Sequence, residues 1–263
     1  IRQQSSLDLL DPEGLEGIGA AELVSGEHQA PLDDYPTRGA ETATRGDIKI
    51  AVDEAYQLMV GAEVDVFESL YKYANITPIN VSEDSVLKLF MEDSVRLMIT
   101  SRKLTSNEEE FLKGQLIIPR TTQIAWDAIA FVVNKSNPDN RLRYNTIKDI
   151  FEGKTDSWKQ INSKSKQGKM QVVFDNQGSS NVRSIMNKLA IKTLPEYCYS
   201  ASSNPAVIDF VEKNPNAIGI ISVNWISDPD DSITHEFLGR VNVVAVTPEF
   251  YSEGNDFYTP HPG

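Results

Sequence analysis

Short apolar runs and helical patterns alternate along most of this chain. The run Ile48–Val52 precedes a helical pattern that extends to Leu70, and the run Ile76–Val81 precedes a helix that Ser82 would cap. Alternation of this kind predicts a parallel sheet with helices on both faces. Ligands of such sheets lie beyond the carboxyl ends of the strands, so polar residues at those ends are the first candidates for a site.

The alternation continues through the rest of the chain. Thr105 and Glu108 have the spacing of a capping box, which predicts a helix start at Thr105. Thr146 would cap a short helix, and Pro205 suits the first turn of another. Further apolar runs lie at Val95–Thr100, Leu116–Pro119, Gln123–Val133, Val172–Phe174, Ala217–Val223 and Val241–Thr247.

The stretch Val172–Ala190 carries the strongest pattern for a ligand site. A buried strand is followed by turn residues, and Ser179 or Ser180 then stands where a helix N-cap is expected. A helix start presents free N–H groups and the positive end of the helix dipole, both of which favour an anion. Arg183, one turn into the helix, would add charge-assisted donors. The alternative interpretation is an ordinary capped helix after a strand.

Composition excludes several classes of function. The chain has 263 residues and a net charge of −13, which repels nucleic acid and anionic membranes, so an anion would have to be held by local dipoles and arginines. Cys198 is the single cysteine, which excludes an intrachain disulfide, and the three histidines have no metal-site spacing. Nucleotide-loop and nucleophile-elbow motifs are absent, so we expect no cofactor, no metal and no enzymatic activity.

The first 45 residues read as a tether. The segment Ile1–Arg45 is acidic, contains Gly, Pro and small residues throughout and has no sustained period, which is typical of a poorly ordered linker. No run is long and apolar enough to span a bilayer, and an initiator Met and a signal peptide are absent, which indicates a mature, trimmed or fragmentary chain.

The order of motifs resembles a known family. The segments ITSRKLTSNEEEF, IAWDAIAFVVNKSNP and TIKDIFEGKTDSW are similar to successive motifs of the phosphate-binding (PstS-like) proteins of ABC importers. IAVDEA is similar to the first strand and ligand loop of variants common among Bacteroidetes-type sequences. The resemblance covers Gly46–Gly263.

This resemblance implies an α/β, two-lobed fold of the type II periplasmic binding protein class. Such a fold has two mixed sheets flanked by helices, a hinge of two crossing strands, and an oxyanion in the cleft between the lobes. Lobe one would comprise residues 46–124 and 219–263, and lobe two residues 125–218. The family continues beyond a segment like DFYTPHPG, so the resemblance also implies a copy truncated at the C-terminus, with an exposed apolar patch on lobe one.

The resemblance also implies a set of ligand-binding residues in four loops and near the hinge. Carried over by position, the second loop comprises Ser82 and Glu83. The phosphate-binding candidates are Asp53, Glu54, Ala55, Ser82, Ser101, Arg102, Asp127, Gly178, Ser179, Ser180 and Asn181, together with Arg183 from the helix pattern above. The chain departs from the family pattern at Asp175, which stands where the family has an arginine, so Arg102 or Arg183 would have to substitute for it. Asp53 and Glu54 stand where the family has a Ser or Thr, and such carboxylates repel an anion unless a protonated ligand donates to them.

The implied function is capture of inorganic phosphate, or a related small oxyanion, for the membrane subunits of an ABC importer. We expect a monomer in the periplasm or at the cell surface, with a lipid anchor on the tether as one possibility. The alternative is a module of the same fold without phosphate binding, used for adhesion, sensing or scaffolding. Asp175 and the long tether favour that alternative.

Overall fold

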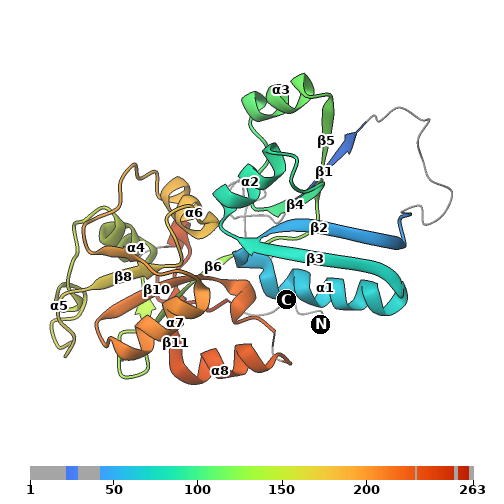
Figure 1. The fold of residues 1–263 in the computed structure, drawn as a ribbon. Helices are drawn as coiled ribbons and strands as arrows, with labels where there is room; N and C mark the ends of the chain where they lie inside the picture. Colours follow the sequence, from blue (N-terminus) through green and yellow to red (C-terminus); the bar gives the residue numbers. More distant parts are fainter. Residues whose placement is uncertain (1–21, 29–41, 229, 252–253, 261–263) are drawn as a thin grey trace, which may run out of the picture.

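Two five-stranded sheets, each covered by helices, form the two lobes of the protein (Figure 1). The computed structural model describes residues 22–28, 42–228, 230–251 and 254–260. Within these residues the chain passes between the two sheets once, through residues 124–128, whereas the resemblance implied a hinge of two crossing strands. We call the part before this passage the first lobe and the part after it the second lobe.

The sheet of the first lobe has the strand order β3-β2-β4-β1-β5. Strand β2 pairs in parallel with β3 and β4, while β1 lies antiparallel between β4 and β5. The helix α1 lies on one face, and α2 and α3 lie on the other (Figure 1). The bounds are β1 Glu22–His28, β2 Arg45–Asp53, the 3₁₀ helix η2 Glu54–Tyr56, α1 Gln57–Leu70, β3 Tyr73–Val81, α2 Glu83–Met91, β4 Leu97–Thr100, α3 Ser106–Gly114 and β5 Ile117–Gln123.

The sheet of the second lobe has the order β11-β6-β10-β8-β9, and a two-stranded sheet joins β7 and β12. Its strands are β6 Ile129–Asn134, β7 Arg141–Leu142, β8 Gln171–Phe174, β9 Cys198–Ser200, β10 Ala217–Ser222, β11 Val241–Val243 and β12 Ala245–Val246. Its helices are α4 Tyr144–Phe151, α5 Trp158–Ile161, α6 Ser180–Lys188, α7 Asn204–Lys213 and α8 Ser232–Arg240, with 3₁₀ turns η3 Val223–Trp225 and η4 Glu249–Tyr251.

The central strand β10 of the second sheet is apolar up to its last residue because it contributes to a core on both faces of the sheet. In β10, Ile218 and Ile220 pack towards α4 and α6, whereas Ala217 and Ile221 pack towards α7 and α8. All six residues of this strand are buried. This arrangement is the expected result of a two-residue side-chain period in a sheet that is covered on both sides.

Several predicted helix starts are confirmed. Ser179 is the N-cap of α6 and accepts from the Val182 N–H, and Thr105 forms a complete capping box with Glu108 at the start of α3. The short helix predicted from Thr146 begins earlier: α4 starts at Tyr144, whose N–H donates to the hydroxyl of Thr247. A side chain 103 positions away therefore holds this helix end, which a local pattern cannot reveal.

Two predicted segment assignments differ from the strand pairing. Part of the predicted tether forms β1, which lies inside the first sheet, and the rest of that segment up to residue 41 lies outside the described residues. The sequence assigned the chain after residue 219 to the first lobe, but β10 pairs with β6 and β8, and β11 pairs with β6. These strands therefore belong to the second sheet. The pairing partners of an apolar strand are set by distant segments, which its own sequence does not specify.

Candidate functional site

Helix starts from both lobes meet where the lobes face each other (Figure 1). The N–H of Asp84, at the start of α2, donates to the carbonyl of Gly178, just before α6, over 3.3 Å. The carbonyl of Ala55, in η2, accepts from the side-chain amide of Asn224, in η3, over 3.1 Å. The carboxyl ends of the strands thus place polar groups of both lobes in one interface.

An ion pair between Glu83 and Arg183 lies at the centre of this interface. The Arg183 Nε lies 2.6 Å from Oε2 of Glu83, and its Nη2 lies 3.1 Å from Oε1. Arg183 also donates to the Ser101 hydroxyl. Glu83 is only 2% exposed, so both of its oxygens are removed from bulk water, and its contacts connect α2 of the first lobe with α6 of the second.

The Glu83 carboxylate is surrounded by donors from its own lobe as well. Its Oε1 accepts from the Thr100 hydroxyl at 2.9 Å, from the Ser101 hydroxyl at 2.6 Å and from the Ser101 N–H at 3.2 Å. Burial alone would raise the pKa of the Glu83 carboxyl. The hydrogen bonds and charge of Arg183, followed by the two hydroxyls, outweigh burial, so the pKa lies below its ordinary value and the group is ionised.

A second carboxylate bridges the lobes at the start of α7. Oε1 of Glu54, in η2, accepts from the N–H of Asn204, and Oε2 accepts from the Asn204 side-chain amide. Burial raises the pKa of Glu54 to about 7, although the bonds from Asn204 favour the charged form. Glu54 therefore satisfies a helix N-terminus that belongs to the opposite lobe.

Two further buried carboxyl groups lie beside these bridges. Asp53 ends β2 and accepts from the Ala55 N–H, and Asp175 follows β8 and accepts from the side-chain amide of Asn181. Each is 1% exposed, and each has one oxygen without a hydrogen-bond partner among the described residues. Burial, followed by the nearby charge of Glu83, raises the pKa of Asp53 to about 8, and burial raises that of Asp175 as well.

The predicted fourth loop lies against the first lobe. Ser179, Ser180 and Asn181 are all at most 3% exposed and form the start of α6. A Cβ on Gly178 would lie 2.6 Å from Oδ2 of Asp84, so the lobes approach closely at this point and a side chain here would force Asp84 to move.

Other predicted site residues have different contacts. Arg102 forms an ion pair with Glu108 at 2.8 Å and donates to the Lys103 carbonyl. The Ser82 hydroxyl lies 3.0 Å from that of Ser85, within the first turn of α2. Asp127 lies in the passage between the lobes and accepts from the Ser222 hydroxyl at 2.7 Å. Burial raises the pKa of Asp127 to about 6. The structure thus brings Asp53, Glu54, Ala55, Ser101, Gly178, Ser179, Ser180, Asn181 and Arg183 to the interface.

Sequence reasoning missed two residues of the interface and did not predict the contacts of a third. Asn204 and Thr100 supply donors to buried carboxylates but were not among the candidates. Glu83 was carried over as a residue of the second ligand loop, yet in the structure it accepts bonds from the other candidate donors. The local signal was available for Glu83, because a carboxylate at a helix start suits the dipole. No local signal indicates that Glu83 pairs with Arg183, which lies 100 positions away.

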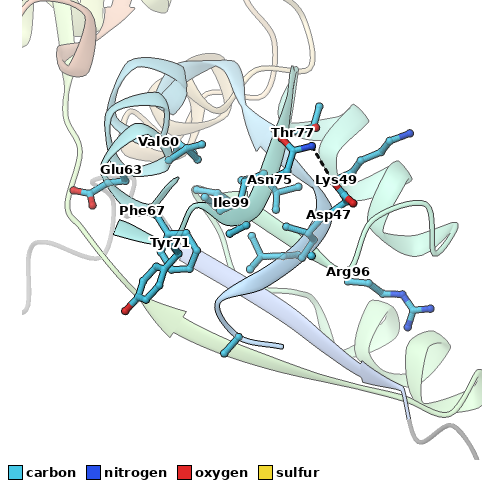
Figure 2. A pocket seen from close by; sticks show the side chains of 18 of the residues that line it. Asp47, Lys49, Val60, Glu63, Phe67, Tyr71, Asn75, Thr77, Arg96 and Ile99 are labelled. Carbon is cyan, nitrogen blue, oxygen red and sulfur yellow. Dashed lines mark hydrogen bonds between the residues drawn. The ribbon is translucent and has the colours of Figure 1, made fainter. Parts of the chain in front are cut away.

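A separate groove of about 1500 Å³ lies in the first lobe, between α1 and the sheet (Figure 2). Its walls include Val60, Phe67 and Ile99, and the polar pair Asp47 and Asn75 at its edge is satisfied internally over 2.8 Å. The exposed apolar patch predicted on this lobe is present: Val66, Leu70 and Tyr71 of α1 are 56%, 69% and 39% exposed. The groove is also lined by basic side chains, of which Arg45 lies over the Tyr73 ring and Arg96 pairs with Asp93.

In the part of the chain that the structure describes, no three His, Cys, Asp or Glu side chains are arranged to hold a metal ion. None of the helices described there is long and apolar enough to cross a membrane.

Comparison with known proteins identifies the family. The sequence pattern of the PBP superfamily domain matches residues 37–255. The phosphate-binding protein PstS of Staphylococcus aureus is 27% identical over 164 residues, which cover 60% of this chain and 49% of that protein. The chain therefore spans about half the length of the curated relatives it matches.

Solved structures share the fold. A phosphate ABC transporter substrate-binding protein from Clostridium perfringens, solved with bound phosphate, has a TM-score of 0.61 at 23% identity and 76% coverage of each chain. An ABC-type phosphate transport receptor from Vibrio cholerae has a TM-score of 0.51 at 19% identity, again with 76% coverage of each chain. A regulatory domain of OxyR2 from Vibrio vulnificus has a TM-score of 0.53 at 10% identity, over 78% of this chain and 83% of that one.

These matches confirm the α/β fold of the type II periplasmic binding protein class and the resemblance to PstS-like binding proteins. This chain belongs to the PBP superfamily.

Proposed function

We propose that this protein captures inorganic phosphate, or a related small oxyanion, between its two lobes and delivers it to the membrane subunits of an ABC importer. The proposed place of action is the periplasm or the cell surface, and the proposed working form is a monomer. The phosphate-binding proteins among its relatives support this proposal, and no bond of the ligand is made or broken in it.

The observation that carries the proposal is the convergence of donors from both lobes. The α2 and α6 helix starts meet there, Ser101 contributes an N–H and a hydroxyl, and Arg183 contributes a planar fork. Helix N-termini and an arginine fork are a donor set that suits a tetrahedral oxyanion. Because the donors belong to different lobes, a bound anion would hold the lobes together and exclude water.

The buried carboxyl groups set conditions on the ligand. Asp53 has a pKa of about 8, so it is largely protonated at neutral pH and does not repel an anion as a carboxylate would. Glu54, whose pKa is raised to about 7, is partly ionised at neutral pH, and a carboxylate can accept a hydrogen bond from a protonated oxyanion, whereas sulfate has no proton to donate at neutral pH. We therefore expect phosphate to be preferred to sulfate.

Isothermal titration with phosphate tests the proposal, with sulfate as competitor. Arg183→Ala should weaken binding at least tenfold, because it removes the one arginine that bridges the lobes in the described interface. Arg240→Ala is the matched control, since that arginine pairs with Glu212 and Glu236 within the second lobe. Absence of phosphate binding by a chain shown to be folded, or equal affinity in both variants, contradicts the proposal.

A binding-protein-like module without phosphate binding, used for adhesion, sensing or scaffolding, is the second candidate. The specific observation in its favour is that Arg183 is already paired with Glu83 and that Asp53, Glu54 and Asp175 surround the pair. Retention of the closed interface together with no heat from any oxyanion would favour this second function.

A further inference from the structure

Glu83 has the surroundings of a bound anion. Its carboxylate is 2% exposed and accepts from the Thr100 hydroxyl, the Ser101 hydroxyl, the Ser101 N–H and two nitrogens of Arg183. We call the donors of Thr100, Ser101 and Arg183 the oxyanion cradle. Five donor contacts on one carboxylate exceed what an ion pair requires and match the coordination of a captured ligand.

The donors of the oxyanion cradle come from both lobes, and Glu83 accepts hydrogen bonds from both sets of donors. Thr100 and Ser101 lie at the end of β4 in the first lobe, whereas Arg183 comes from α6 in the second. Glu83 also belongs to the first lobe, so its carboxylate accepts donors of its own lobe and one charged fork from the other. An external oxyanion in the cradle would make the same bridge.

We propose that Glu83 is an internal occupant of the oxyanion cradle, which fills it while no ligand is bound and must leave for an external oxyanion to enter. This inference rests on the proposed function for the identity of the competing ligand, phosphate. The cradle itself is defined by the contacts of Glu83, whichever anion replaces it.

Electrostatic repulsion prevents Glu83 and an external oxyanion from occupying the oxyanion cradle together, so one must replace the other. Two anions that shared the Arg183 fork would repel each other in a buried site where water screens poorly. Asp53 and Asp175 lie close by, and neither supplies a positive charge that could offset a second anion. The apparent affinity for an external ligand is therefore reduced by the stability of the internal contact.

The first test empties the cradle and refills it with formate, the smallest carboxylate. Glu83→Ala leaves the donors of Thr100, Ser101 and Arg183 without their acceptor, which destabilises the fold. Sodium formate should raise the midpoint of thermal unfolding of Glu83→Ala by several degrees in a saturable manner, compared with sodium chloride at equal ionic strength. The wild-type chain and Glu212→Gln, which alters an arginine-paired carboxylate far from the interface, should show no such rise.

The second test measures competition. Glu83→Gln keeps the shape of the side chain and removes its charge, so phosphate should bind at least tenfold more tightly than to the wild-type chain. Unchanged or weaker binding of both phosphate and sulfate in Glu83→Gln overturns the inference, because Glu83 would then be a support of the ligand or a purely structural partner. This measurement decides the question also where Glu83→Ala does not fold.

The outcomes separate this inference from the proposed function. No formate response in a folded Glu83→Ala overturns the internal occupant even if the wild-type chain binds phosphate tightly. A formate response, combined with tighter binding of sulfate but not phosphate in Glu83→Gln, supports the internal occupant and contradicts phosphate as the ligand.

Discussion

The Glu54 carboxylate of the first lobe lies 3.1 Å from the backbone nitrogen of Asn204, the first residue of α7 in the second lobe. A helix N-terminus is usually capped by a residue that directly precedes it, and Ser203 does so here by accepting from the Ala206 N–H. Glu54 adds a second acceptor, which comes from 150 positions away. The hydrogen bonds from Asn204 to Glu54 therefore form only when the two lobes are in contact.

Glu54→Ala should loosen this contact. It leaves the Asn204 N–H and side-chain amide without their acceptor, and we expect a loss of about 1–2 kcal/mol in the free energy of unfolding. Urea unfolding at neutral pH measures it. Glu63→Ala, on the exposed part of α1, is the control and should change stability by less than about 0.5 kcal/mol. Equal effects of the two substitutions would contradict a bridging role for Glu54.

Asp53→Asn should change how stability depends on pH. The pKa of Asp53 is raised from 3.8 to about 8, so between these values the folded protein holds a proton that the unfolded chain releases. Stability therefore falls as pH rises through this window, and asparagine removes that contribution while its side-chain oxygen can still accept from Ala55. We expect Asp53→Asn to match the wild type at about pH 5 and to exceed it by roughly 1–3 kcal/mol at about pH 8.

The measurement is urea unfolding of both chains across this pH range. Glu54 and Asp127, whose pKa values are raised to about 7 and about 6, contribute a fall of the same sign in both chains. The difference between the chains isolates Asp53. A constant difference from low to high pH would show that Asp53 does not carry a buried proton.

Much of the fold could be predicted from the sequence because its signals are local. The N-cap at Ser179, the capping box of Thr105 and Glu108, and the buried run of β10 each depend on residues close together in the chain. Sheet membership depends on pairing partners, so β1 and β10 were assigned to the wrong parts of the molecule.

The sequence indicates which loops hold the candidate residues, but it does not indicate which charged side chains pair with each other. Ser101, a candidate from the resemblance, and Arg183, a candidate from the helix pattern, lie at one interface, but a motif does not show which charge neutralises which. Arg102 has the same local setting as a ligand residue, at a strand end beside a serine, and its guanidinium instead pairs with Glu108. Arg102 pairs with Glu108 and Arg183 pairs with Glu83 because of how α2, α3 and α6 pack.

Gly219→Ala should destabilise the second lobe. A Cβ at this position of β10 would lie 2.7 Å from Val207 and 2.8 Å from Val132 and Val211, in a core that has no room for it. We expect a loss of about 1–3 kcal/mol. Gly61→Ala is the matched control, because a Cβ there meets nothing within 4 Å and alanine favours the interior of α1 by about 0.5–1 kcal/mol. Opposite signs in thermal unfolding confirm the prediction, and a loss in both would contradict it.

Gly178→Ala should separate the lobes without altering any charge. The new Cβ would lie 2.6 Å from Oδ2 of Asp84 and 3.2 Å from its Cβ, so rotation of the Asp84 side chain relieves only part of the overlap. We expect a loss of about 1–2 kcal/mol in the free energy of unfolding, and weaker oxyanion binding, because the donors of the two lobes move apart. Asp84→Ala removes the nearest atoms, so the double variant should recover at least half of the loss. A double-mutant cycle measures this coupling. Additive effects would show that the two residues do not meet, and the absence of a loss in Gly178→Ala alone would show that the lobes tolerate a side chain there.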